Sequence, residues 1–179
     1  MEGPLTVETT ISIDVQAPPA LVFALARDVE RWPDLLPHYA RVSRIERDPD
    51  GTVTASFTAR RPILGVLGWG LPVVWRSRTW SEPETQRLRF VHVAGATAGM
   101  DVTWRIEETA TGSHVAIDHR FRRRLPIPVL GSLLGDGLFP AFVDRFFTRP
   151  IAGRTLATFK AIAEAVHTSG SAARTNEVA

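Results

Sequence analysis

Six stretches of alternating apolar and polar residues, arranged as three pairs around short turns, constrain the fold of this chain most. Each stretch has the two-residue period of a strand that buries one face. They form three pairs around the turn sequences DPDG, PETQ and TG, at residues 39–48 and 52–61, 72–82 and 87–95, and 100–110 and 113–123. Strand pairs around tight turns predict three successive hairpins, and therefore an antiparallel sheet.

Another strand and two short helices are predicted before the hairpins. Residues 5–16, LTVETTISIDVQ, alternate like the other strands. A helix follows at 17–32, with two prolines in its first turn, where proline is tolerated. Trp32-Pro33 ends that helix, because a residue before proline disfavours the helical conformation, and a second short helical turn follows.

A long helix is predicted after the hairpins, over about residues 138–166. Pro150 predicts a kink or a break at its middle. The remaining residues, 167–179, have the composition of a disordered tail.

One long helix cannot cover a flat sheet of seven strands, yet an antiparallel sheet must bury one of its faces. We therefore expect the sheet to curl around the helix and to leave space between them. The prediction is one α+β domain over residues 1–166, with a curved seven-stranded antiparallel sheet, two short helices after the first strand, a long C-terminal helix and an internal cavity.

Composition restricts the classes of function. Of the 179 residues, 44% are apolar, but no apolar stretch reaches the roughly 20 residues of a membrane span, and the first residues lack a signal-peptide pattern. The lack of cysteine makes the cytoplasm the expected compartment. The net charge is only +2 and the one basic cluster, at 120–126, is short, so no nucleic-acid partner is expected.

The strand segment VVWRSRTW, at residues 73–80, combines arginine with tryptophan. Strand parity divides it into two faces. One face carries Val74, Arg76, Arg78 and Trp80, and the other carries Val73, Trp75, Ser77 and Thr79. Charged residues are mostly exposed, whereas an arginine inside a cavity needs a carboxylate, enolate or carbonyl partner. The residues alone leave both orientations of this strand open.

Four segments carry a resemblance to a known family, namely DVERWPDLLPHY, SRTWSEPETQRLRFVHV, MDVTWRIEET and GRTLATFKAIAE. With the order of elements, they make the chain similar to the helix-grip (START/Bet v 1-like, SRPBCC) superfamily over about residues 5–166. The closer similarity is to the bacterial polyketide aromatase/cyclases. The first segment also occurs in relatives that bind coenzyme Q.

The resemblance implies a set of site residues. The implied aromatic and apolar lining of the cavity consists of Trp32, Tyr39, Met100 and Trp104. Arg78 and Tyr39 are the implied catalytic residues: the arginine anchors or polarises a carbonyl or enolate, and the tyrosine hydroxyl assists by hydrogen bonding. Parity then brings Arg76 and Trp80 towards the ligand as well.

Two departures from the family pattern affect the polar chemistry of the site. Arg76 stands where the pattern has a serine, and Ala152 and Gly153 stand near positions where the cyclases use polar residues. The resemblance therefore implies the cavity more directly than it implies the reaction.

His92 and His119 lie on strand faces that are predicted to be buried or to face the cavity. Each is either a core histidine satisfied by hydrogen bonds or a base that removes a proton next to a ketone. His119 is counted among the predicted ligand-binding residues. The five histidines lack the spacing of metal ligands and no nucleotide-binding motif occurs, so neither a metal nor a cofactor is expected.

Two apolar segments, residues 62–72 and 125–140, each follow arginines and are interrupted by glycine and proline. Because loops are normally polar, these segments must cover something. They are predicted to close the mouth of the cavity, to contact a second copy of the chain in a homodimer, or to touch a membrane surface.

The expected function is the binding of a hydrophobic, partly oxygenated small molecule in the cavity. The resemblance implies that a poly-β-ketone is folded and cyclised there. The alternative is a non-catalytic carrier of a lipid or an isoprenoid quinone, which contact of the apolar segments with a membrane would favour.

Overall fold

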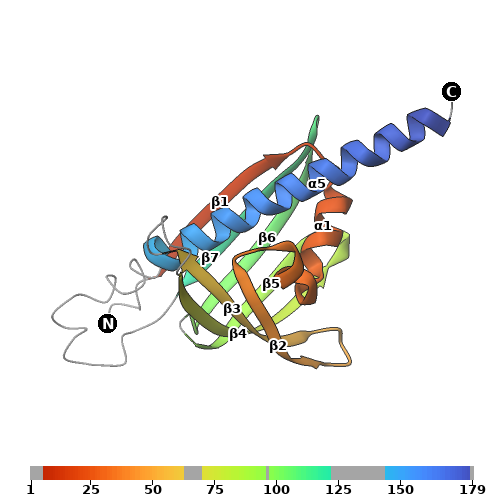
Figure 1. Ribbon diagram of the computed structural model, residues 1–179. Helices are drawn as coiled ribbons and strands as arrows, with labels where there is room; N and C mark the ends of the chain where they lie inside the picture. The colour runs from red at the N-terminus through yellow and green to blue at the C-terminus, as the bar shows by residue number, and fades with distance from the viewer. Residues whose placement is uncertain (1–5, 63–69, 96, 122–143, 178–179) are drawn as a thin grey trace, which may run out of the picture.

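The fold is a curved antiparallel sheet that grips one long helix (Figure 1). The computed structural model describes residues 6–62, 70–95, 97–121 and 144–177. The seven strands lie in the spatial order β1-β7-β6-β5-β4-β3-β2. They are β1 (Val7–Val15), β2 (Tyr39–Arg47), β3 (Val53–Pro62), β4 (Gly70–Glu82), β5 (Arg87–Gly95), β6 (Met100–Thr109) and β7 (Gly112–Phe121). The predicted helix-grip fold is confirmed.

Short helices connect the two edges of the sheet. Although β1 and β2 are consecutive strands in the sequence, they form its opposite edges, and the helices between them carry the chain across. The described helices are α1 (Pro19–Arg27), η1 (Val29–Arg31), α2 (Trp32–Leu35), η2 (Pro83–Thr85), η3 (Asp144–Thr148) and α5 (Arg149–Glu177). The two short helices predicted after the first strand are therefore present.

β-Bulges bend the sheet. The pairing of β2 with β3 shifts its register between Ser43 and Glu46, and the pairing of β4 with β5 shifts between Arg76 and Ser77. A bulge adds a residue to one strand, which bends it and increases its twist. Gly95 lies beside the second shift with a φ of +89°, and an added Cβ would lie 2.3 Å from the carbonyl oxygen of Val74. The close approach of the two strands here requires glycine.

The hydrophobic core lies between the concave face of the sheet and α5. Strands β5 and β6 bury every second residue over most of their length, as their alternation predicts. Helix α5 contributes a buried stripe at helical spacing that consists of Ala152, Leu156, Phe159 and Ala163.

The C-terminal helix differs from its prediction in its last residue and in the place of Pro150. Residues 167–177 are helical rather than a disordered tail, because α5 continues to Glu177. The apolar stripe of α5 ends before Val166, which is 48% exposed, because the helix passes the edge of the core there. No proline follows in the sequence to end the helix at that point. Pro150 is the second residue of α5, which directly follows the π-helical turn η3, so it lies where the helix type changes rather than at the middle of α5.

The two apolar segments are described only in part. Residues 62–72 are described at their ends, where Pro62 closes β3 and Gly70 opens β4, and residues 125–140 lie outside the described residues. What these segments cover therefore stays a prediction. Among the described helices, none is both long enough and apolar enough to cross a membrane.

We predict that Gly95→Ala lowers the free energy of unfolding by about 2 kcal/mol or more, because the new Cβ meets the backbone of Val74 and alanine disfavours a positive φ. Gly153→Ala is the matched control. Nothing lies within 4 Å of its Cβ position, and a helical alanine adds up to about 1 kcal/mol. Urea unfolding followed by tryptophan fluorescence measures both variants. Wild-type stability of Gly95→Ala would contradict the close strand approach at this bulge.

Candidate functional site

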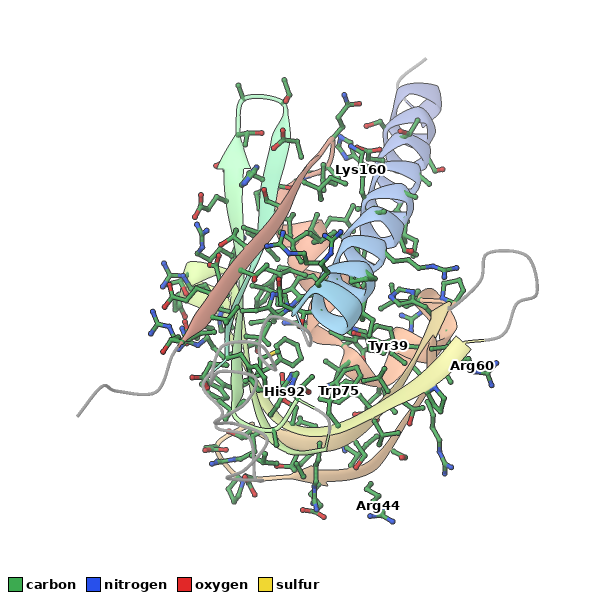
Figure 2. All side chains as sticks on the ribbon, turned by 90° about the vertical axis from the view of Figure 1, so that its left-hand side faces the viewer. Tyr39, Arg44, Arg60, Trp75, His92 and Lys160 are labelled. Carbon is green, nitrogen blue, oxygen red and sulfur yellow. The ribbon has the colours of Figure 1, made fainter. Side chains whose placement is uncertain are left out.

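A cavity lies between the concave face of the sheet and the first turns of α5. Its volume is about 70 Å³, several times the roughly 10–15 Å³ that one water molecule needs. The described residues that line it are Trp32, Tyr39, Phe57, Val73, Trp75, Phe90, His92, Thr97, Met100, Val102, Trp104, Ile117, His119, Thr148, Ile151, Ala152 and Thr155. Figure 2 shows Tyr39, Trp75 and His92 gathered beneath the first turns of α5, whereas Arg44 and Arg60 lie outside.

Trp32, at the start of α2, is the centre of the aromatic lining. Its indole N–H donates a hydrogen bond to the carbonyl oxygen of Ala26 at 3.0 Å, which satisfies the one polar atom of the ring. Its ring centroid lies between 5.0 and 6.1 Å from those of Tyr39, Phe57, Phe90, Trp104 and Phe159. These rings come from β2, β3, β5, β6 and α5, so the Trp32 side chain contacts four strands and the long helix at the cavity.

Trp75 lines the cavity from β4. Its ring stacks on Phe57 with centroids 5.4 Å apart and an interplanar angle of 9°, and on His92 with centroids 5.7 Å apart and an angle of 27°. Trp75 and these two rings thus form a stacked aromatic surface. Such a surface favours a planar ligand, because offset stacking is the preferred contact between aromatic rings.

Tyr39 and His38 meet the hydroxyl of Thr155 at one side of the cavity. Thr155 Oγ1 donates to the carbonyl oxygen of Ile151 at 2.8 Å, so its lone pairs must accept the proton of His38 Nε2, which lies 2.8 Å away. Burial, and next the charge of Arg154, lower the pKa of His38 to about 4. Burial raises the pKa of the Tyr39 hydroxyl above its usual range, although its hydrogen bond with Thr155 opposes this. Tyr39 therefore stays protonated.

His92 and His119 face the cavity from β5 and β7. His92 Nδ1 lies 2.6 Å from Thr97 Oγ1, which fixes the orientation of the ring. Burial, and next the neighbouring His119, lower the pKa of His92 to about 3. Burial also lowers the pKa of His119 to about 4, although the charge of Asp144 acts in the opposite direction. Both imidazoles are neutral at pH 7.

Three buried polar atoms near the start of α5 have no hydrogen-bond partner within the described part of the chain. They are His119 Nδ1, Thr148 Oγ1 and Asp144 Oδ1. The other carboxylate oxygen of Asp144 accepts a hydrogen bond from Arg149 Nε at 2.8 Å. Unpartnered buried polar atoms are rare because they are costly. This corner therefore fits a ligand or a water molecule that supplies the missing hydrogen bonds.

The orientation expected for Arg78, Arg76 and Trp80 is wrong. These residues share one face of β4 as parity predicted, but that face is the outer one. The side chain of Arg78 is 53% exposed, and its Nη2 lies 3.9 Å from Asp48 Oδ2, while Arg76 pairs with Glu46 at 2.7 Å. Trp80 is half-buried on the same outer face. Carboxylates on the outer face supply the partners that a guanidinium would lack in an aromatic cavity.

The other predicted site residues do lie together. Trp32, Tyr39, Met100, Trp104 and His119 all line the cavity. Their roles toward a ligand stay predictions. The sequence interpretation missed Trp75, Phe57, Thr148 and Thr155. Only Trp75 had a usable signal, since it stands on the less charged face of β4.

The site can hold a flat, neutral molecule and hydrogen-bond it at its edges. The described lining contains no Asp, Glu, Lys or Arg, and its histidines are uncharged at pH 7. An ionised ligand group would therefore lose its hydration here without gaining a counter-charge from these residues. The polar atoms that remain can orient hydroxyl or carbonyl groups and move a proton.

The chain is similar in sequence to proteins of polyketide biosynthesis. Residues 15–147 match the family model described as polyketide cyclase / dehydrase and lipid transport. A protein of Streptomyces cyaneus that is named as a candidate polyketide cyclase is 30% identical over 122 residues, which cover 68% of this chain and 76% of that protein.

Solved structures share the fold. The ZhuI aromatase/cyclase from Streptomyces sp. R1128 superposes with a TM-score of 0.66 at 21% identity, covering 89% of this chain and 93% of that one. The di-domain aromatase/cyclase BexL from the BE-7585A biosynthetic pathway superposes with a TM-score of 0.71 at 20% identity, covering 89% of this chain and 50% of that one. With the family model matching well over half of its length, this chain belongs to the polyketide cyclase / dehydrase and lipid transport family.

Proposed function

We propose that this protein binds a flat, oxygenated, uncharged small molecule in its cavity and promotes the cyclisation and dehydration of a poly-β-ketone. The observation that carries the proposal is the combination of a stacked aromatic wall with two neutral imidazoles. Trp75, Phe57 and His92 provide the wall, and His119 provides a basic nitrogen with no partner among the described residues.

His119 is the residue best suited to act as the base. Its Nδ1 is buried and free of hydrogen bonds to the described residues, and a neutral imidazole can accept a proton from a carbon between two carbonyl groups. The charge of Asp144 would stabilise the imidazolium that forms, because it already raises the pKa of His119 against the effect of burial.

Tyr39 is suited to hydrogen-bond the carbonyl that is attacked, and its O–H would turn from Thr155 to the ligand to do so. Its hydroxyl stays protonated, since burial raises its pKa. The enolate carbon would add to this carbonyl carbon, and the resulting alkoxide would take a proton. Loss of one water molecule, with the hydroxyl leaving and a second carbon-bound proton transferred to a base, would give a cyclic enone. Enolisation of the remaining ring ketones would then complete an aromatic ring. Positioning and exclusion of water supply most of the acceleration in such a site.

Binding is the first testable step. Tyr39→Phe should weaken the binding of alizarin, a flat polyphenol, by about two- to tenfold, because one hydrogen bond is lost and the ring is kept. Arg78→Ala is the matched control and should leave the dissociation constant unchanged, since Arg78 lies on the outer face. Quenching of tryptophan fluorescence measures both. If Arg78→Ala weakened binding as much as Tyr39→Phe, the position of the Arg78 side chain on the outer face of the sheet would be contradicted.

Catalysis is tested separately. The protein would be added to a polyketide synthase that releases an uncyclised poly-β-ketone, and the products analysed by mass spectrometry for the loss of one water molecule per ring. His119→Ala should keep alizarin binding within a few-fold and lose this product. A wild-type protein that binds ubiquinone more tightly than alizarin and forms no cyclised product would instead be a carrier.

The pH dependence follows from the lowered histidine pKa values. With a pKa of about 4, His119 stays neutral through the range from pH 8 to about 5, so the cyclisation rate should be flat there and fall as the pH approaches 4. An inflection near pH 6.5, the ordinary value for histidine, would show that His119 is not the base.

Stability must be measured at each pH as a control. Unfolded histidines have pKa values near 6.5, whereas those of His38, His92 and His119 in the folded protein are about 3 to 4. Between these values the unfolded state binds more protons. The free energy of unfolding should therefore decrease as the pH falls below about 6.5. Urea unfolding at each pH separates this loss from the loss of activity.

A further inference from the structure

A second, smaller pocket meets the main cavity at Phe90. Its volume is about 60 Å³, and its lining combines the apolar residues Val29, Val53 and Leu88 with polar residues, which are Arg27, Thr79 and Ser81. Val29 and Leu88 are buried, at 5% and 2% exposure. This side pocket therefore extends the apolar interior of the sheet beyond the space that the proposed function uses.

Phe90 separates the two spaces. Of the described residues, it alone lines both the main cavity and the side pocket. Phe90 as a whole residue is 4% exposed, and the centroid of its ring lies 5.7 Å from that of Trp32 and 6.5 Å from that of Phe57. One side of the Phe90 ring thus contacts the aromatic lining of the main cavity, and the other side borders the side pocket near Leu88.

The side pocket leads to the outer face of the sheet. It shares Gly51, Trp80 and Ser81 with an open groove on that face, which Arg78 also lines. Trp80 is half-buried and Arg78 is 53% exposed in its side chain, so this groove is in contact with solvent. The order of spaces is therefore main cavity, Phe90, side pocket, and outer groove.

We propose that Phe90 sets the length of the ligand. This inference rests on the proposed function, because it takes the main cavity to be the binding site. The ring closes the inner end of the cavity, so a bound molecule must stop at Phe90. Without the ring, the cavity and the side pocket become one channel, apolar around Leu88 and Val29 and polar where it opens beside Trp80 and Ser81, and a hydrocarbon tail can run through it to solvent.

The packing around Phe90 explains why the ring holds its place. Trp32 and Phe57 lie against it on the cavity side, and the ring cannot move towards either of them without displacing a large side chain. The side pocket offers space for a few water-sized groups but not for the whole ring system of Phe90 together with a ligand tail. Phe90 is thus a fixed end wall.

The test uses ligands that share a dihydroxyphenyl head and differ only in tail length: orcinol with a methyl tail, olivetol with a pentyl tail, and undecylresorcinol. Dissociation constants are measured by quenching of tryptophan fluorescence. In the wild-type protein, undecylresorcinol should bind about tenfold or more weaker than olivetol. In Phe90→Ala the order should reverse, because the added methylene groups become buried in the new channel. Phe90→Leu, a smaller truncation that preserves the core better, should shift the preference in the same direction.

Two controls make the result specific to the partition. Phe57→Leu enlarges the main cavity without opening the side pocket, because Phe57 lines only the former, so it should not favour the long tail. Phe90→Ala combined with Leu88→Phe refills the side pocket and should abolish the gain. Circular dichroism confirms that each variant is folded.

The outcomes distinguish this inference from the proposed function. If wild-type protein binds none of the three resorcinols, the proposed binding site for flat phenols fails. If the wild-type protein binds all three tails equally, or if Phe90→Ala and Phe90→Leu change the three affinities by the same factor, Phe90 is only part of the lining. The length inference is then overturned while the binding site stands.

Discussion

The contact on which the rest of this structure depends is that of the Trp32 indole with five aromatic rings from four strands and one helix. A curled sheet around a single helix has more concave surface than the helix can cover. The large indole, with its N–H satisfied by Ala26, fills part of that difference from a helical turn outside the sheet. What it does not fill is the cavity. The binding site is therefore the part of the core that the fold leaves unpacked.

One electrostatic constraint explains both the charge state of the cavity and the orientation of β4. Burial makes charge expensive, so the histidines in the cavity remain neutral and Tyr39 keeps its proton. The same cost places Arg76 and Arg78 on the outer face, where Glu46 and Asp48 are available as partners. The described residues of this site supply no counter-charge to an ionised ligand. The site therefore selects uncharged ligands without a specific contact that recognises them.

The sequence predicts the fold well because alternation acts locally. The alternating period of each strand is visible within a few residues, and the turns inside the three hairpins are short. The order of seven strands and one long helix therefore follows without tertiary information. Parity also groups Val73, Trp75, Ser77 and Thr79 correctly, but it cannot say which face is concave when both carry tryptophan. That choice depends on partners from distant strands and from the β2–β3 turn. The tail was mispredicted for a related reason: loss of an apolar stripe ends packing, but it does not end a helix.

The polar groups of the site were the part of the structure that was hardest to predict from the sequence. Thr148, Thr155 and Asp144 come from the segment where the chain enters α5, and nothing in their spacing indicates that they meet His38 and His119 from other elements. Their unpartnered atoms are costly for folding, as are the two spaces on either side of Phe90. A chain that needed only stability would fill such spaces and pair such atoms. Retaining both beside a stacked aromatic wall is the pattern expected of a core that is shaped for a ligand.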